Sequence, residues 1–220
     1  AAPFLTRRQI ERYAQVMRRL ALNAVGTLPD SEERDVHHEV TSLTLDIVNQ
    51  TLFGSNLSVD PTRVGHNLDV VMDYFFRVSR SMKRLIPKWI PTRDNRNATA
   101  AVKELDEVVF SIIEQRRREG AEGDDLLSRL LSVRDEDGSQ MSDTQVRDEV
   151  ITMFLAGHET SALTLANTLW LLSLHPEIET RLREELAPLE GELPLARLDS
   201  LPLLDAVLKE TLRLRPPAWI

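Results

Sequence analysis

A stretch of about 33 residues without a helix breaker, from Ser142 to His175, is the feature that most constrains the fold. Ser142 and Gln145 have the spacing of a capping box, and Pro176 ends the stretch. At 1.5 Å per residue it predicts a single helix of about 50 Å. A helix of this length within 220 residues favours a mainly α architecture.

The other segments also carry apolar residues at helical spacing, separated by turn residues. In the first of these helices Ile10, Ala14, Met17, Ala21 and Ala24 form an apolar stripe. In the fourth, Val102, Leu105 and Val109 are expected to face inward. We expect one mainly α domain over residues 1–220. The predicted helices begin near Thr6, Asp35, Asp60, Thr92, Leu126, Pro176 and Asp199, and they end near Gly26, Gly54, Pro87, Gly120, Val133, Pro188 and Pro216.

Charge and composition exclude several classes of protein. The chain has 27 basic and 35 acidic residues, a net charge of −8, which disfavours nucleic-acid binding and a basic membrane-surface patch. It has no cysteine, which excludes disulfides, iron–sulfur clusters and a thiol nucleophile within these residues. The apolar stretch 150–174 contains Glu159, and a central carboxylate costs about 3 kcal/mol on insertion. We therefore predict no membrane span in this chain.

The centre of the long helix, residues 156–161, has an unusual composition: Ala-Gly-His-Glu-Thr-Ser. Gly157 costs about 1 kcal/mol relative to alanine inside a helix. The Thr160 hydroxyl can bond back to the Ala156 carbonyl, and Gly157 shares its helix face, so a notch lies beside a hydroxyl. Glu159 is an acid within an apolar run. Spacing alone leaves open a plainer interpretation, in which Gly157 permits close packing and Glu159 is solvated or paired.

A zinc hydrolase is a competing hypothesis, because His158-Glu159 could begin the helical motif with two histidine ligands and a catalytic glutamate. The second ligand would have to stand four residues after the first, where the chain has Ala162. His38-Glu39 fails in the same way, because Ser42 occupies the ligand position. The sequence predicts no metal site built from its own residues.

A second feature lies near the C-terminal end, at Glu210-Thr211-Leu212-Arg213. An acid and a base three residues apart on a helix form an ordinary surface pair. Glu114 and Arg117 have the same spacing, so the pair alone indicates little. Its surroundings, from Lys209 to Pro216-Pro217, are more specific.

Together these two segments resemble the haem-thiolate monooxygenases of the cytochrome P-450 superfamily. Residues 156–161 resemble the oxygen-activation motif of that family, and residues 210–217 are similar to its Glu-x-x-Arg helix and following Pro-Pro. Trp170 and His175-Pro176-Glu177 also match, and residues 35–54 resemble an earlier helix of bacterial members. The resemblance covers nearly the whole chain and implies the orthogonal helical core of that fold, incomplete here.

The resemblance implies roles for the residues of both segments. Ala156, Gly157 and Thr160 would bind the haem cofactor on its distal side. Glu159 and Thr160 would be catalytic and would deliver protons during O₂ activation, which is general acid chemistry. Glu210 and Arg213 would form a structural ion pair, part of a buried ion-pair network that holds the proximal half of the core together.

The same resemblance implies a cofactor, partners and a location. The complete protein would use haem, O₂ and a hydrophobic small-molecule substrate such as a lipid or terpenoid. A ferredoxin or a flavoprotein reductase would donate electrons, in the cytoplasm.

One part of the family pattern is missing from these residues. The axial ligand of such enzymes is a cysteine thiolate, and this chain contains no cysteine. We therefore expect a central fragment without the N-terminal region and the cysteine loop, inactive by itself. The alternative is a truncated, non-catalytic helical interaction module.

Overall fold

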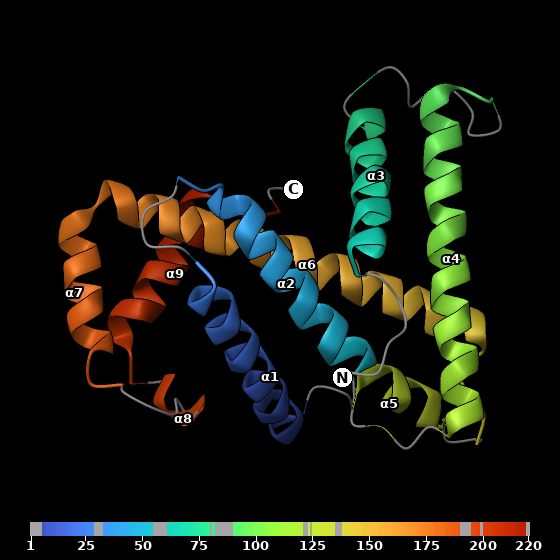
Figure 1. The fold of residues 1–220 in the computed structure, drawn as a ribbon, viewed down its shortest axis with the longest axis horizontal. Coiled ribbons are helices and arrows are strands. Elements are labelled where there is room, and N and C mark those ends of the chain that lie inside the picture. The colour runs from blue at the N-terminus through green and yellow to red at the C-terminus, as the bar shows by residue number, and fades with distance from the viewer. Residues whose placement is uncertain are drawn as a thin grey trace. The chain divides into compact units, whose positions relative to one another are not determined.

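The computed structural model describes residues 6–28, 33–54, 61–79, 81, 90–120, 123, 125–134, 138–189, 195–198 and 200–218. Within these ranges the chain is helical (Figure 1), and the one β-type pairing is an isolated bridge between Arg134 and Gln140. The predicted mainly α architecture is confirmed. The helices are α1 Arg7–Gly26, α2 Val36–Phe53, α3 Pro61–Ser79, α4 Arg93–Glu119, α5 Leu126–Ser132, α6 Asp143–Leu174, α7 Pro176–Leu186, α8 Leu195–Leu198 and α9 Pro202–Leu214.

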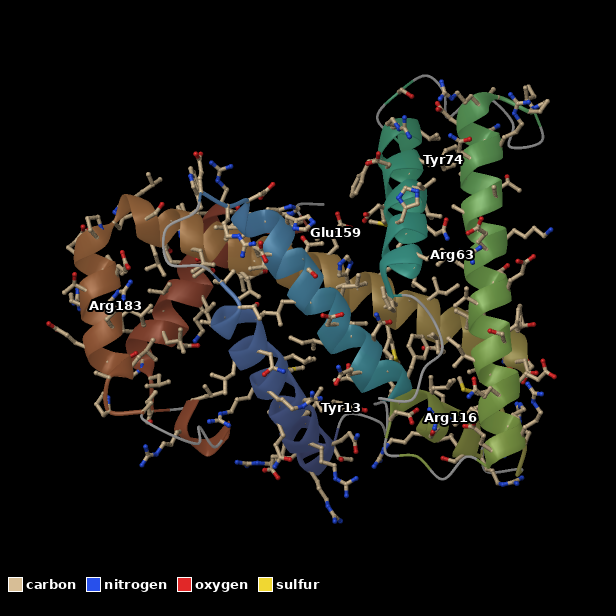
Figure 2. The ribbon with its side chains drawn as sticks, viewed as in Figure 1. Tyr13, Arg63, Tyr74, Arg116, Glu159 and Arg183 are labelled. Atoms are coloured by element: carbon tan, nitrogen blue, oxygen red, sulfur yellow. The ribbon has the colours of Figure 1, made fainter. Side chains whose placement is uncertain are left out.

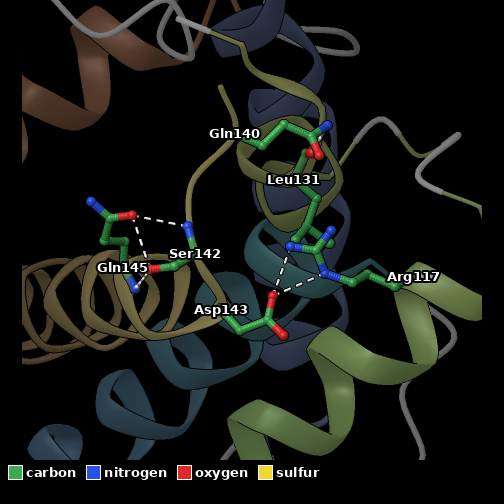
Figure 3. Close-up of polar contacts among 6 residues, drawn as sticks. All are labelled: Arg117, Leu131, Gln140, Ser142, Asp143 and Gln145. Carbon is green, nitrogen blue, oxygen red and sulfur yellow. Dashed lines mark hydrogen bonds and ion pairs between the residues drawn. The ribbon is translucent and has the colours of Figure 1, made fainter. Parts of the chain in front are cut away.

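The predicted caps form at the starts of the helices. At α1 the hydroxyl of Thr6 accepts a hydrogen bond from the Gln9 amide at 3.4 Å. At α6 the capping box is reciprocal (Figure 3): the Ser142 amide donates to Gln145 Oε1 at 2.9 Å, and the Gln145 amide donates to Ser142 Oγ at 3.3 Å. These bonds satisfy amides that a helix start leaves without an intrahelical acceptor, which is why the pattern locates the start.

Other boundaries differ from the prediction. Helix α9 begins at Pro202, whereas a start near Asp199 was expected. Proline fits the first helical position and disfavours helical geometry in the preceding Leu201, whose ψ is 72°. The short α8 was not predicted. Three predicted boundary residues, Asp60, Pro87 and Asp199, lie outside the described residues.

The chain divides into two compact units. One comprises residues 1–48 and 156–220, and the other comprises residues 49–155. Each boundary falls inside a helix, one in α2 and the other in α6, and both helices are continuous there.

In the unit formed by residues 49–155, α3 and α4 lie side by side (Figures 1 and 2). Glu104 on α4 accepts hydrogen bonds from Arg63 Nε and Nη2 and from Asn67 Nδ2, each at 3.1 Å. These bonds, led by the one from Asn67, lower the pKa of Glu104 below its ordinary value. Further along, the Tyr74 hydroxyl donates to Asn95 Oδ1 at 2.9 Å. Polar contacts therefore set the alignment of the two helices at both places.

The inward-facing prediction holds for part of α4. Leu105 and Val109 are buried, but Val102 is 42% exposed, so its inward placement was wrong. The buried face instead continues through Ala98 and Ala101, and Val102 lies about 100° round the helix from Ala101.

Two residues of the apolar stripe in α1 are exposed. Ile10 and Met17 are 44% and 43% exposed, and no described part of the chain buries them. The buried residue of α1 is Gln9.

An ion pair that is largely shielded from solvent joins α4 to the end of α2 and the start of α5. Arg116 on α4 places Nη2 3.2 Å from Asp125 Oδ2, and their side chains are only 17% and 6% exposed. The same Nη2 donates to the Phe53 carbonyl, at the end of α2, at 2.7 Å. Asp125 is also the N-cap of α5 and accepts from the Ser128 amide at 2.9 Å. The charged run at residues 116–118, which ends a helix, therefore contains a buried structural cation.

Replacing Asp125 with alanine should destabilise this unit strongly. The change removes the α5 cap and leaves the Arg116 guanidinium buried without its counter-ion, which costs about 3–5 kcal/mol. The free energy of unfolding, measured by urea denaturation, is the test.

The matched control for Asp125→Ala is Asp143→Ala. Asp143 pairs with Arg117 at 2.7 Å (Figure 3), and both side chains are exposed, at 51% and 38%. An exposed pair contributes less than about 1 kcal/mol. Equal losses in the two variants would contradict the structural role of Asp125.

Candidate functional site

The centre of α6 forms the candidate site and carries the predicted back-bond. The Thr160 hydroxyl donates to the Ala156 carbonyl, one turn earlier. Gly157, Glu159 and Thr160 are half-buried, Ala156 is exposed, and Figure 2 labels Glu159 in this helix. The segment therefore presents small side chains and one hydroxyl close to an acid.

The notch at Gly157 faces α2. A Cβ built on Gly157 would lie 3.4 Å from Val48 Cγ2, which is an ordinary van der Waals distance. The plainer interpretation of Gly157, close helix packing, therefore has a specific contact. The space accepts a methyl group and little more.

The Thr160 back-bond is the first of a set that we call the threonine series, Thr160, Thr164 and Thr168. Thr164 Oγ1 donates to the Thr160 carbonyl at 2.8 Å, and Thr168 Oγ1 donates to the Thr164 carbonyl at 2.7 Å. Sequence reasoning singled out only Thr160, although threonines at every fourth residue were the signal available. Such back-bonds share carbonyls with the helical amides and loosen the helix.

Glu210 and Arg213 form the predicted pair on α9, and it is bidentate. Arg213 Nε and Nη2 donate to the two carboxylate oxygens at 2.8 and 2.6 Å. The hydrogen bond from Arg213 lowers the pKa of Glu210 below its ordinary value. Both side chains are more than half exposed in this chain, so within these residues the pair lies on the surface.

Sequence reasoning missed the residues that hold α9 in place. Glu185 on α7 accepts hydrogen bonds from the amides of Leu203 and Leu204 at 2.9 and 3.0 Å, and so caps α9 from another helix. Beyond the other end of α9, the Arg215 guanidinium lies 4.8 Å from the ring centre of Trp170 on α6. The sequence offered no signal for Glu185, because its partners lie 18 and 19 residues away.

A groove of about 420 Å³ lies between the end of α6, the start of α7 and the length of α9. Its walls are largely apolar, with three titratable side chains among them. The lining residues are Leu171, Leu172, His175, Glu177, Ile178, Leu203, Ala206, Val207, Glu210, Thr211 and Leu214.

The zinc-hydrolase hypothesis gains no support. His158 is buried within α6, with 5% of its surface exposed. Among the residues that the structure describes, no three of the types His, Cys, Asp and Glu are grouped to hold a metal ion.

In the described part of the chain, no helix is both long and apolar enough for a membrane span.

Comparison with known proteins identifies the class. The cytochrome P450 family model matches residues 2–220, and the chain belongs to this family. Family membership implies haem as the cofactor of the complete protein.

Two relatives come from Streptomyces. Pentalenene oxygenase of Streptomyces avermitilis is 38% identical over 220 residues, which cover 97% of this chain and 48% of that protein. Cyclooctat-9-en-7-ol 5-monooxygenase of Streptomyces melanosporofaciens is 35% identical over 203 residues, 90% of this chain and 44% of that protein. The chain thus spans about half the length of these relatives.

Solved structures agree on the fold. A cyanobacterial CYP120A1 with bound retinoic acid superposes with a TM-score of 0.83 at 24% identity, over 97% of this chain and 47% of that one. The haem domain of cytochrome P450DA gives a TM-score of 0.80 at 26% identity, over 96% of this chain and 47% of that one. The predicted helical core of the cytochrome P-450 fold is confirmed.

The residues present fit one side of a haem. Ala156 is exposed and Thr160, one turn further along, adds only a small side chain, so a flat group can approach this helix face closely, whereas a Cβ at Gly157 would face Val48 on α2. The chain has no cysteine to supply an axial thiolate. It can therefore contribute a wall of the cofactor site but not the iron ligand of this family.

Replacing Gly157 with alanine should stabilise the haem-free chain by up to about 1 kcal/mol, since alanine is the better helix former and its methyl would lie 3.4 Å from Val48 Cγ2. Gly157→Val is the matched variant and should destabilise, because two further methyl groups crowd Val48. Urea denaturation measures both. A lower free energy of unfolding in Gly157→Ala would mean that the notch has no room for a methyl group.

Proposed function

We propose that the complete protein containing this chain is a haem-dependent monooxygenase, with residues 156–160 on the distal side of the cofactor. The observation that carries the proposal is the Thr160 back-bond to Ala156 beside Gly157 and Glu159, in a chain of the cytochrome P450 family. Bound haem would supply the oxidation chemistry, and the protein would supply the pocket and the path for protons.

Thr160 would act through the two lone pairs of its hydroxyl. A hydroxyl has one proton to donate, and Thr160 gives it to the Ala156 carbonyl. The oxygen can therefore accept a hydrogen bond from a water molecule while its own proton stays on the helix. For Thr160 to donate to another group instead, its hydrogen bond to the Ala156 carbonyl has to open.

Glu159 would load the path with protons. It is a carboxyl group one residue from Thr160, half-buried, and so in reach of water. A carboxylate positioned in this way can take a proton from solvent and pass it through ordered water, as a general acid does. Ala156 and Gly157 would leave room for O₂ and the cofactor.

The substrate would be a hydrophobic small molecule. Two relatives are named for oxygenating pentalenene and cyclooctat-9-en-7-ol, which supports this class. A ferredoxin or a flavoprotein reductase would deliver the electrons. Residues 1–220 alone would not catalyse the reaction, because they contain no cysteine for the haem iron.

We also propose that residues 1–220 belong to one domain. Domain boundaries usually fall in exposed linkers. Here the boundaries between the two compact units fall within α2 and α6, and neither helix is interrupted there.

The proposed role of Thr160 predicts that removal of its hydroxyl lowers the coupling of the enzyme, which is the amount of product formed per reduced nicotinamide consumed. In the haem-loaded complete protein, Thr160→Ala should retain folding and substrate binding, since it removes one hydroxyl and one methyl group. Less product should form per reduced nicotinamide consumed, with peroxide released in its place, because proton delivery fails. Product, nicotinamide and peroxide are assayed together.

Thr160→Ser and Thr152→Val are the controls for this measurement. Serine keeps the hydroxyl and should retain more coupling than alanine. Thr152 lies on the same helix, is exposed, and makes the same kind of back-bond, to the Asp148 carbonyl at 2.7 Å, so its loss should leave coupling unchanged. If Thr160→Ala remains fully coupled, the hydroxyl does not deliver protons and Thr160 is a packing residue.

The ion pair of α9 predicts a contrast between two forms of the protein. We propose that Glu210 and Arg213 are structural in the complete protein. Glu210→Ala should then abolish haem incorporation there, yet change the unfolding of residues 1–220 little, because the pair is exposed in that chain. Haem content per protein and urea denaturation measure the two effects, with Glu114→Ala as control. Full haem content in Glu210→Ala would mean that Glu210 and Arg213 form only an ordinary surface pair.

A further inference from the structure

Val48 on α2 lies opposite the glycine of the candidate site. Among the described residues, Val48 Cγ2 is the nearest atom of another helix to a Cβ built on Gly157, at 3.4 Å. Val48 is only 9% exposed, and it continues a buried face of α2 that includes Val40 and Thr44, at intervals of four residues. Val48 and Gly157 belong to the same compact unit. The notch at Gly157 is therefore closed on the α2 side by one specific side chain.

The shape of Val48 suits it to fix a distance between helices. A β-branched side chain on a helix keeps essentially one χ1 rotamer, so its two methyl groups stay in place. Gly157 has no side chain that could move aside, so the α6 side of the contact is helix backbone. A glycine leaves a hole in the helix surface, and in a close-packed interior a side chain of the neighbouring helix fills it. Val48 therefore sets the separation of α2 and α6 at this turn.

Gly157 is joined rigidly to the group that accepts the hydrogen bond of Thr160. The Thr160 hydroxyl donates to the Ala156 carbonyl, and this carbonyl belongs to the peptide unit that ends at the Gly157 Cα. A peptide unit is planar, so its carbonyl and the Cα that follows move together. A contact that restrains Gly157 therefore also restrains the acceptor of the Thr160 hydroxyl.

We propose that Val48 is a positioning residue for the oxygen-activation segment 156–160: it closes the notch from α2 and holds the peptide unit to which the Thr160 hydroxyl is bonded. The motif itself lies on α6 alone, so this role adds a residue from a different helix. The functional part of the inference rests on the proposed role of Thr160, whereas the packing of Val48 against Gly157 does not.

The test compares Val48→Ala, which leaves a void at the notch, with Val146→Ala as matched control. Val146 is 0% exposed and lies on α6 about three turns before Gly157, so the same change leaves a void away from the segment. Amide hydrogen exchange over residues 156–161 is measured by mass spectrometry in the haem-loaded complete protein, together with coupling. Val48→Ala should speed exchange about tenfold and lower coupling, whereas Val146→Ala should affect both much less.

A methyl group added at Gly157 should reverse part of the effect of Val48→Ala. In the double variant Val48→Ala/Gly157→Ala the new methyl fills the void from the α6 side. It should therefore slow exchange more than Gly157→Ala does in the parent protein, where Val48 already fills that space. Alanine improves helix propensity equally in both backgrounds, so the difference between them reports the contact between the two positions.

Unchanged exchange in Val48→Ala would overturn the proposal. Equal acceleration in Val48→Ala and Val146→Ala would also overturn it, because a general loss of packing would then be the cause. Equal slowing by Gly157→Ala in both backgrounds would overturn it too, because the two residues would then act independently. If Val48→Ala takes up no haem, the variants and the parent are compared as haem-free complete proteins, with the same expectations for exchange.

The functional part of the inference can fail separately from the packing. If Val48→Ala exchanges faster but stays fully coupled, while Thr160→Ala uncouples, Val48 does not position the Thr160 hydroxyl. If Thr160→Ala stays coupled while Val48→Ala exchanges faster, the proposed function fails and the packing role of Val48 is supported.

Discussion

The unbroken course of helix α6 is the constraint on which the rest of the structure depends. From Asp143 to Leu174 the chain is one continuous helix, whose turns pair their backbone amides and carbonyls within the helix itself. It supplies buried side chains to both compact units, Val150 and Phe154 to one, Ala162 and Thr168 to the other. The segment 156–160 lies within this helix, and back-bonded threonines also stand before and after it. Its glycine and its back-bonded threonine are tolerated because the flanking turns hold the helix together.

Buried polar contacts at helix ends fix the other helices. Arg116 contacts the last carbonyl of α2 and the cap of α5 together, and Glu185 caps α9 from α7. Helix termini leave backbone amides and carbonyls without intrahelical partners, so a charged side chain placed there satisfies several groups at once. Thr211 works differently, since its side chain contacts the side chain of Thr168 on another helix and no backbone group at a helix end. Among the motif residues His158 and Thr211 are buried, and the others lie half-buried or exposed.

Sequence reasoning succeeded where the controlling interactions are local. The capping box at Ser142 and the Thr160 back-bond join residues three or four positions apart, and both form as predicted. It was less accurate about which residues are buried. Ile10 and Val102 fit an apolar stripe by spacing, yet both are exposed, because periodicity selects a face without saying whether another element covers it.

The sequence by itself determined the helices, their caps, the two motifs and, through them, the family. Each of these depends on neighbours within about one helical turn, where the covalent chain sets the geometry. Tertiary structure alone decided which side chains that lie far apart in the sequence contact one another. Glu114 and Arg117 share the spacing of Glu210 and Arg213, yet Arg117 pairs with Asp143, 26 residues away. Tertiary structure also buries Thr211 of α9 and brings the amides of Leu203 and Leu204 to the Glu185 carboxylate. Those contacts exist only once folding has brought separate helices together.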